Sequence, residues 1–180
     1  MADTPQAQLI TILVVDDDPA VGMMARVGLV PHGYRVYSVT SGEAAIRHIS
    51  NDPPDLILLD VILPGISGFD VCQRLRQSPD GNQIPVVVIT SLDDSASIEQ
   101  AYEAGATAFV TKPINWPMLR HQLQYVLRAS RDRARLAESE ERYALAASGA
   151  NDGLWDWDIN AQRVYFSPRW LEQLQLRNDG

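Results

Sequence analysis

The chain of 180 residues has a single cysteine and no long apolar run. Because Cys72 has no second thiol to pair with, no internal disulfide holds the fold together. Its longest apolar runs, such as Leu56 to Leu59, are far too short to cross a bilayer, and the opening MADTPQAQ lacks a signal-peptide layout. We therefore expect a cytoplasmic protein with no membrane partner.

Lysine is almost absent as well. Lys112 is the only lysine, and the other 14 positive side chains are arginine. A lysine in such a background indicates a site that needs a compact ammonium group rather than a forked guanidinium.

Charge is divided unevenly along the chain. Residues 1–115 hold 14 acidic and 6 basic side chains, a net charge of −8, whereas residues 116–148 hold 4 acidic and 6 basic ones, a net charge of +2. So acidic an N-terminal part repels the phosphate backbone, and we expect no nucleic-acid partner.

Five short, β-branched apolar runs alternate with helical stretches. Strands that are apolar on both faces belong in a parallel sheet covered by helices on each side. We predict a doubly wound α/β fold with five parallel strands in the order 2-1-3-4-5 and an extended C-terminal helix. The predicted strands are Ile10 to Val15, Tyr34 to Val39, Leu56 to Leu59, Val86 to Ile89 and Ala108 to Thr111.

Three helix starts have side chains that can cap them. Asp18 directly precedes a proline, as an N-cap residue precedes a first helical turn. Thr40 with Glu43, and Ser67 with Asp70, have the spacing of capping boxes. We therefore expect helices to begin just after Asp18, Thr40 and Ser67.

The last helix should be long, because residues 118–148 contain neither proline nor glycine. Small and apolar residues recur in it at steps of four and three, which predicts a weak coiled-coil seam and a homodimer. A single solvated helix is the alternative. The seam residues are Leu123, Leu127, Ser130, Ala134, Ala137, Glu141 and Ala144.

After Gly149 tryptophan and tyrosine become frequent. The alternating runs Leu154 to Ile159 and Arg163 to Phe166 predict a β-hairpin, with a helix starting at Ser167. Residues 149–180 are too few to build a core of their own. We expect them to be the first part of a second domain.

Chemically unusual side chains follow the predicted strands. Ligands of open parallel sheets bind at the carboxyl ends of the strands. Two carboxylates about 4 Å apart repel by roughly 4 kcal/mol, so a cation must lie among several of them, and oxygen ligands suit Mg²⁺. The residues are Asp16 and Asp17 after the first strand, Asp60 after the third, Thr90 and Ser91 after the fourth, and Lys112 after the fifth.

This set of groups suits phosphoryl chemistry. A carboxylate beside a cation can attack phosphorus and form an acyl phosphate, while a hydroxyl and an ammonium bind the other oxygens. Asp60, Thr90 and Lys112 fit those roles. Each has a structural explanation by itself, as a turn, helix-preceding or surface residue, but their meeting at one end of one sheet favours function.

The segments VVDDDP, LILLDVILPGISGFD, VVVITS and FVTKP together resemble the receiver domain of two-component response regulators, over roughly residues 9–128. The resemblance implies that a histidine kinase or phosphotransfer protein phosphorylates Asp60. It also implies that Asp16, Asp17, Asp60 and the backbone carbonyl of Ile62 bind Mg²⁺, with Mn²⁺ as a substitute.

The same resemblance implies how the site responds. Thr90, Ser91 and Lys112 would contact the phosphoryl group, and Phe109 matches the aromatic residue that swings inward on activation. Helix four, strand five and helix five would form the dimer face. A receiver only assists its own phosphorylation and dephosphorylation, so we do not expect the chain itself to be an enzyme.

The tail ERYALAASGANDGLWDWDINAQRVYFSPRW is similar to the opening of a PAS sensor domain. The domain organisation expected from both resemblances is an N-terminal tail (1–8), a receiver (9–128), a helical linker continuous with helix five (129–148) and a truncated PAS domain (149–180). An output domain would follow in the same chain.

Two other functions fit parts of the pattern. A phosphatase with an aspartyl nucleophile should have a general-acid aspartate two residues after that nucleophile, where this chain has Ile62. A scaffold would bind the cation, never accept phosphate, and only dimerise.

Overall fold

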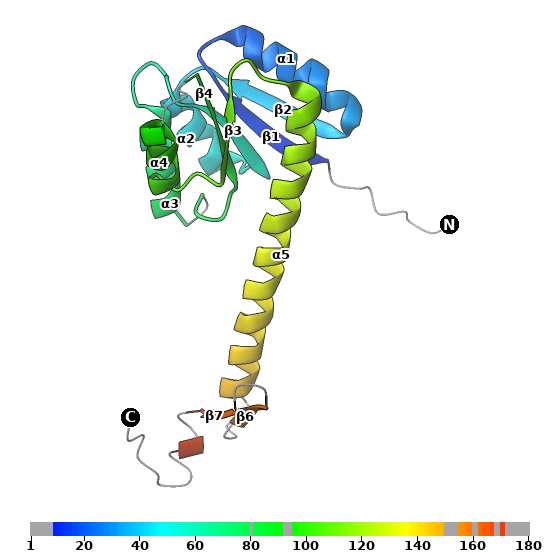
Figure 1. The fold of residues 1–180 in the computed structure, drawn as a ribbon, viewed down its shortest axis with the longest axis vertical. Coiled ribbons are helices and arrows are strands. Elements are labelled where there is room, and N and C mark those ends of the chain that lie inside the picture. Colours follow the sequence, from blue (N-terminus) through cyan, green and yellow to red (C-terminus); the bar gives the residue numbers. More distant parts are fainter. Residues whose placement is uncertain are drawn as a thin grey trace, which may run out of the picture. The chain divides into compact units, whose positions relative to one another are not determined.

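The computed structural model of the chain describes residues 9–79, 81–91, 95–149, 155–159, 162–167 and 170–171. Strands and helices alternate through the first two thirds of it (Figure 1). The strands of the large sheet are β1 (Ile10–Val15), β2 (Tyr34–Val39), β3 (Leu56–Asp60), β4 (Val86–Thr90) and β5 (Ala108–Thr111). The helices are α1 (Pro19–Leu29), the short 3-10 helix η1 (Val30–His32), α2 (Gly42–Asn51), α3 (Gly68–Gln77), α4 (Ser95–Glu103) and α5 (Trp116–Gly149).

The five strands form one parallel sheet in the order β2-β1-β3-β4-β5, which confirms the predicted fold class and strand order. Every residue of β3 and β4 is buried, as expected of strands that are covered on both faces. The register pairs Val15 with Leu59 and Thr90 with Thr111, so the carboxyl ends of neighbouring strands lie at one edge.

Two apolar cores lie on opposite faces of the sheet. Helices α2, α3 and α4 cover one face, and α1 and α5 cover the other (Figure 1). Cys72 of α3 is fully buried in the first core, where it packs as a small apolar residue. Leu119 and Leu123 of α5 are fully buried in the second.

The predicted helix caps are correct at two of three positions. The Asp18 carboxylate accepts a hydrogen bond from the Ala20 backbone N–H at 2.9 Å, and Ser67 forms a complete capping box. The prediction for Thr40 was wrong by one residue, because the Ser41 hydroxyl caps α2. The Glu43 carboxylate accepts from the Ile66 backbone N–H at 3.3 Å.

Helix α5 is long, as predicted, and its first turn is capped by the Asn115 side chain, which accepts from the Met118 backbone N–H at 3.1 Å. By compactness the chain divides into two units, residues 1–131 and 132–180. None of the described helices combines the length and apolar character that crossing a membrane requires.

In the second unit the predicted hairpin is confirmed. Strands β6 (Trp155–Asp158) and β7 (Arg163–Phe166) pair antiparallel, with Trp155 opposite Phe166 and Trp157 opposite Val164. These four side chains share one face, which is therefore apolar. The Ser167 hydroxyl accepts from the Trp170 backbone N–H at 3.2 Å, at the predicted helix start.

Candidate functional site

Three strands of the sheet, β1, β3 and β5, bring the candidate site together at its carboxyl edge. Asp16 directly follows β1, Asp60 is the last residue of β3, and Lys112 directly follows β5. The Lys112 ammonium lies between the two carboxylates, 2.9 Å from Asp16 Oδ2 and 2.7 Å from Asp60 Oδ2. Residues that are 96 and 52 positions apart in the sequence thus form one ion cluster.

The two carboxylates are much more deeply buried than the cation. The side chains of Asp16 and Asp60 are 1% and 7% exposed, whereas that of Lys112 is 31% exposed. The Asp16 carboxylate also accepts from the Asp18 backbone N–H at 2.9 Å, and Asp60 accepts from the Ile62 backbone N–H at 3.4 Å. Backbone donors and one ammonium therefore share the stabilisation of two buried charges.

One ammonium does not balance this cluster. Burial raises the pKa of Asp60, and the Asp16 charge adds to the rise, although the Lys112 hydrogen bond and charge oppose it. For Lys112, burial lowers the pKa, but the hydrogen bonds to Asp60 and Asp16 outweigh it and raise the pKa overall. The upward shift on the acid reflects chiefly its burial, and the upward shift on the base reflects its two anionic partners.

A third carboxylate completes a group that can hold a cation. Oxygens of Asp16, Asp17 and Asp60 lie within 4.8 Å of one another, and Asp17 is exposed to solvent. An all-oxygen donor set with excess negative charge fits a hard divalent ion such as Mg²⁺. Asp18, the fourth acidic residue nearby, is engaged as the cap of α1.

The remaining predicted residues take different positions. Thr90, the last residue of β4, is 4% exposed, and its backbone carbonyl accepts from the Lys112 backbone N–H at 2.8 Å. Ser91 is exposed. Phe109 of β5 is half-buried and meets the ring of Tyr102 edge-on, with ring centroids 6.1 Å apart. Sequence reasoning did not identify Tyr102, because nothing in the pattern of α4 relates it to β5.

The loop after Asp60 is held from two sides. The Gly68 backbone N–H donates to the Val61 carbonyl at 2.9 Å, and a Cβ at Gly68 would lie 2.1 Å from the Asp60 backbone oxygen. Glu43 reaches the other end of the loop through Ile66. Sequence reasoning missed this role of Glu43, since its spacing from Thr40 indicated a cap instead.

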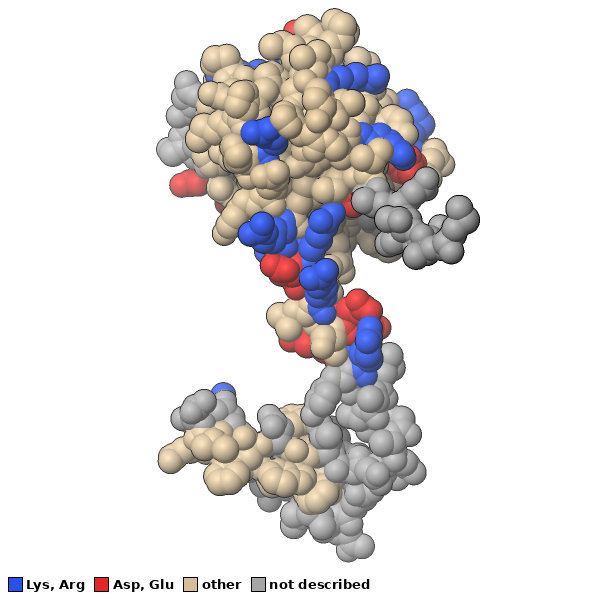
Figure 2. Space-filling view, turned by 90° about the vertical axis from the view of Figure 1, so that its right-hand side faces the viewer, with Lys and Arg blue, Asp and Glu red and all other residues tan. Residues whose placement is uncertain are grey.

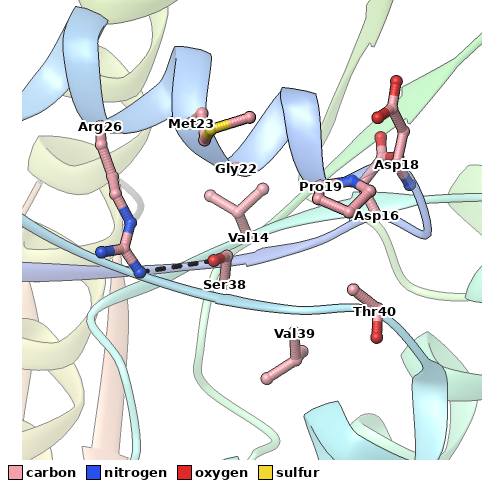
Figure 3. A pocket seen from close by; sticks show the side chains of 10 residues that line it. All are labelled: Val14, Asp16, Asp18, Pro19, Gly22, Met23, Arg26, Ser38, Val39 and Thr40. Carbon is pink, nitrogen blue, oxygen red and sulfur yellow. Dashed lines mark hydrogen bonds between the residues drawn. The ribbon is translucent and has the colours of Figure 1, made fainter.

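A separate hollow of about 250 Å³ adjoins the site between α1 and β2 (Figure 3). Val14 and Met23 line it, and the Arg26 guanidinium donates to the Ser38 hydroxyl at 3.5 Å across one end. It touches the cluster only through Asp16, because its lining includes neither Asp60 nor Lys112 among the described residues. Asp60 and Lys112 at the strand ends therefore lie outside the lining of this hollow.

Comparison with known proteins agrees with this geometry. The family model described as the response regulator receiver domain matches residues 12–124. The response regulator PleD of Caulobacter vibrioides is 38% identical over 165 residues, covering 85% of this chain and 36% of PleD. The transcriptional regulatory protein AfsQ1 of Streptomyces coelicolor is 36% identical over 118 residues, covering 66% of this chain and 51% of AfsQ1. The chain thus spans about half or less of these relatives.

Solved structures show the same fold. The receiver domain protein of Methanospirillum hungatei superposes with a TM-score of 0.66 at 24% identity, covering 70% of this chain and 99% of that one. The beryllofluoride-activated N-terminal receiver domain of Klebsiella pneumoniae RstA superposes with a TM-score of 0.61 at 35% identity, covering 66% and 98%. With its strand order and strand-end carboxylates, the chain belongs to the response regulator receiver domain family.

Proposed function

We propose that Asp60 accepts a phosphoryl group from the phosphohistidine of a histidine kinase or phosphotransfer protein. A carboxylate oxygen of Asp60 forms the new bond to phosphorus as the P–N bond breaks, and the histidine nitrogen leaves with the electron pair. The observation that supports this proposal is the Lys112 ammonium 2.7 Å from the Asp60 carboxylate, where it can bind the transferred oxygens.

Three carboxylates face a single ammonium at the site, so the reaction needs a bound cation. Asp16, Asp17, Asp60 and the Ile62 backbone carbonyl would hold Mg²⁺, or Mn²⁺ in its place. The bound ion supplies positive charge for the equatorial phosphoryl oxygens. Lys112 supplies the second positive charge. Its ion pair with Asp16 holds the ammonium in position.

Phosphorylation adds a charge near −2 beside Lys112. In the proposed response Thr90 and Ser91 bind phosphoryl oxygens, and Phe109 moves inward from its edge-on contact with Tyr102. The face formed by α4, β5 and α5 then shifts between two pre-existing states.

The proposed domain organisation is an N-terminal tail (1–8), a receiver (9–128), a helical linker (129–148) and the beginning of a PAS domain (149–180). The match to PleD covers 85% of the chain, more than the receiver alone, and takes up only 36% of PleD. An output domain in the same chain, with the activity that the receiver itself lacks, would receive the signal through α5. We propose a cytoplasmic location.

We also propose a homodimer formed through α4, β5, α5 and the linker helix. An apolar groove of about 400 Å³ between β5 and α5 supports this proposal. Tyr125 of α5 borders the groove and is 76% exposed. Such a surface is typical of a protein interface.

The proposed acceptor is tested by intact-mass measurement after treatment with phosphoramidate and Mg²⁺. We expect one phosphoryl group on the wild type and none on Asp60→Asn. Asp52→Asn, which alters an exposed aspartate at the end of α2, is the control and should label like the wild type. Equal labelling of Asp60→Asn and wild type would contradict the proposal.

Replacing Asp17 should abolish cation binding, whereas replacing Asp18 should not. MgCl₂ at about ten times its dissociation constant should stabilise the wild type by about 1.4 kcal/mol, because it binds only the folded state. Asp17→Asn should abolish this gain at little structural cost, since Asp17 is exposed. Asp18→Asn retains a capping side chain and should keep the gain. Thermal melts with and without Mg²⁺ measure both, and equal gains in the two variants would contradict the assigned ligands.

The two other functions have less support. A phosphatase needs an acid that protonates the leaving group, and position 62 offers an isoleucine side chain, 60% exposed, beside the acceptor. A scaffold that never accepts phosphate would use the Lys112 ammonium only to stabilise the buried carboxylates of Asp16 and Asp60. Turnover of small phosphate esters would favour the phosphatase, and absence of any labelling of Asp60 would favour the scaffold.

A further inference from the structure

The loop after Asp60 has few buried side chains to hold its shape. Ile62, which contributes its backbone carbonyl to the proposed cation site, is 60% exposed, and Gly65 is exposed as well. Leu63 and Ile66 pack only partly against the first core. Exposed segments with little buried apolar surface open readily to other conformations. The conformation of this loop therefore depends on the contacts that fix its backbone.

The first turn of α2 supplies such contacts. The Glu43 carboxylate accepts a hydrogen bond from the Ile66 backbone N–H at 3.3 Å. The same carboxylate lies over Gly65, because a Cβ added there would be 2.5 Å from Glu43 Oε1. A Cβ added at Gly42 would be 2.5 Å from Ile66 Cγ1, so the isoleucine side chain lies directly on the helix backbone. Two consecutive residues of α2 thus hold both the backbone and the side chain of Ile66.

The anchor at Glu43 is both charged and well supported. The pKa of Glu43 lies below its ordinary value, mainly because the carboxylate accepts from its own backbone N–H and, against partial desolvation, from the Ile66 N–H. It is therefore ionised at neutral pH, and hydrogen bonds to a charged acceptor are stronger than those to a neutral one. Helix α2 is itself fixed, since Ala45 and Ile49 are buried in the first core. The loop is thereby tied to a well-packed element.

We propose that Glu43 is a positioning residue for the cation site. Its bond to Ile66 keeps the loop after Asp60, and with it the Ile62 backbone carbonyl, in one conformation before the cation binds. The inference rests on the proposed function, because it takes Ile62 as a ligand. A ligand that is held in place beforehand loses less conformational entropy on binding, so removing its support lowers the affinity for the ion.

A purely helical role for Glu43 predicts a different result. Glu43 is the second residue of α2, and its negative charge also stabilises the helix N-terminus. Glu43→Ala and Glu43→Gln both remove that charge, but glutamine keeps an oxygen that can accept from the Ile66 N–H. The two variants therefore separate the loop anchor from the helix dipole and from the net charge.

Titration calorimetry with MgCl₂, in the absence of any phosphodonor, measures the affinity directly. Glu43→Ala should raise the dissociation constant about tenfold, the low end of the range for groups that orient metal ligands, because Glu43 acts through the loop backbone. Glu43→Gln should raise it less than about twofold. Glu138→Ala makes the same substitution at an exposed glutamate of the other compact unit, and should leave the dissociation constant unchanged. Figure 2 shows exposed acidic and basic side chains along that part of α5.

Hydrogen exchange followed by mass spectrometry gives a second readout that needs no cation. In EDTA, the peptide that contains Ile66 should exchange faster in Glu43→Ala than in the wild type, because the N–H loses its acceptor. Glu43→Gln should keep the slow exchange. The Ser41 hydroxyl still caps α2 in both variants, so their circular dichroism should match that of the wild type.

Unchanged affinity in Glu43→Ala, or equal losses in the two Glu43 variants, would overturn the inference. A wild type that binds no Mg²⁺ would overturn it together with the assigned ligands. Labelling of Asp60 by phosphoramidate, measured on the same samples, reports separately on the proposed acceptor. A labelled wild type combined with an unaltered affinity in Glu43→Ala would contradict only the role of Glu43.

Discussion

Gly68→Ala should destabilise the protein by about 3 kcal/mol, because the added methyl group has no space. Its Cβ would lie 2.1 Å from the Asp60 backbone oxygen and 2.9 Å from the Val61 Cα, both backbone atoms that cannot rotate away. The gain in helix propensity from alanine, about 1 kcal/mol at most, is smaller. Urea denaturation followed by circular dichroism measures the difference.

The matched control for this substitution is Gly33→Ala. Gly33 has φ +86, and an added Cβ would meet nothing within 4 Å, so only the left-handed backbone conformation opposes the change. That conformation costs about 1 kcal/mol for alanine. If Gly68→Ala were no more destabilising than Gly33→Ala, that result would contradict the close approach of α3 to the end of β3.

Lys112→Met should cost about 3 kcal/mol of stability in the absence of divalent cations. It leaves the carboxylates of Asp16 and Asp60, 1% and 7% exposed, without their ammonium, and an uncompensated buried charge is the expensive result. Because the Lys112 side chain is itself 31% exposed, we expect the low end of the range for buried pairs. Thermal and urea denaturation in EDTA provide the measurement.

Charge, and not packing, should account for that loss. Adding Asp60→Asn to Lys112→Met should recover part of the stability, because one of the two opposed carboxylates is removed. Lys112→Arg keeps the charge but not the compact shape, and should lose less, about 1 kcal/mol. Millimolar MgCl₂ should stabilise Lys112→Met more than the wild type, since the cation then supplies the missing charge; an equal gain in both would contradict this account.

The sign of the pH dependence follows from the direction of the pKa shift. The pKa of Lys112 is raised in the folded state, so its contribution is fully present below the unfolded-state pKa and disappears as the pH rises through the folded-state pKa. At neutral pH the whole contribution is therefore present. The difference in stability between wild type and Lys112→Met should narrow only in strongly alkaline solution.

Much of this fold could be predicted because its patterns are local. The β3 and β4 runs are apolar at consecutive positions, which is typical of buried parallel strands, and each of the five strands was predicted to within one residue. The proposed site was predictable for a related reason. Once the strand order is known, Asp16, Asp60 and Lys112 must lie at one edge, and only their distances needed coordinates.

The features that sequence reasoning missed depend on contacts between distant segments. Glu43 supports the loop after Asp60 through Ile66, 23 residues away, and no periodicity encodes that pairing. The first two residues of the predicted α5 seam, Leu123 and Leu127, have the spacing of a coiled coil but pack into the core of their own domain. Periodicity gives the face of a helix and leaves open which partner covers it.

The most direct test of the proposed function is to locate the phosphoryl group in the chain. Reduction of an aspartyl phosphate with borohydride converts that aspartate to homoserine, which peptide mass spectrometry detects. After treatment with phosphoramidate and Mg²⁺ we predict homoserine at position 60 and at no other aspartate, and none in an untreated sample. Homoserine at another aspartate, or its absence from position 60 in a sample that carries the label, would contradict the assignment of Asp60.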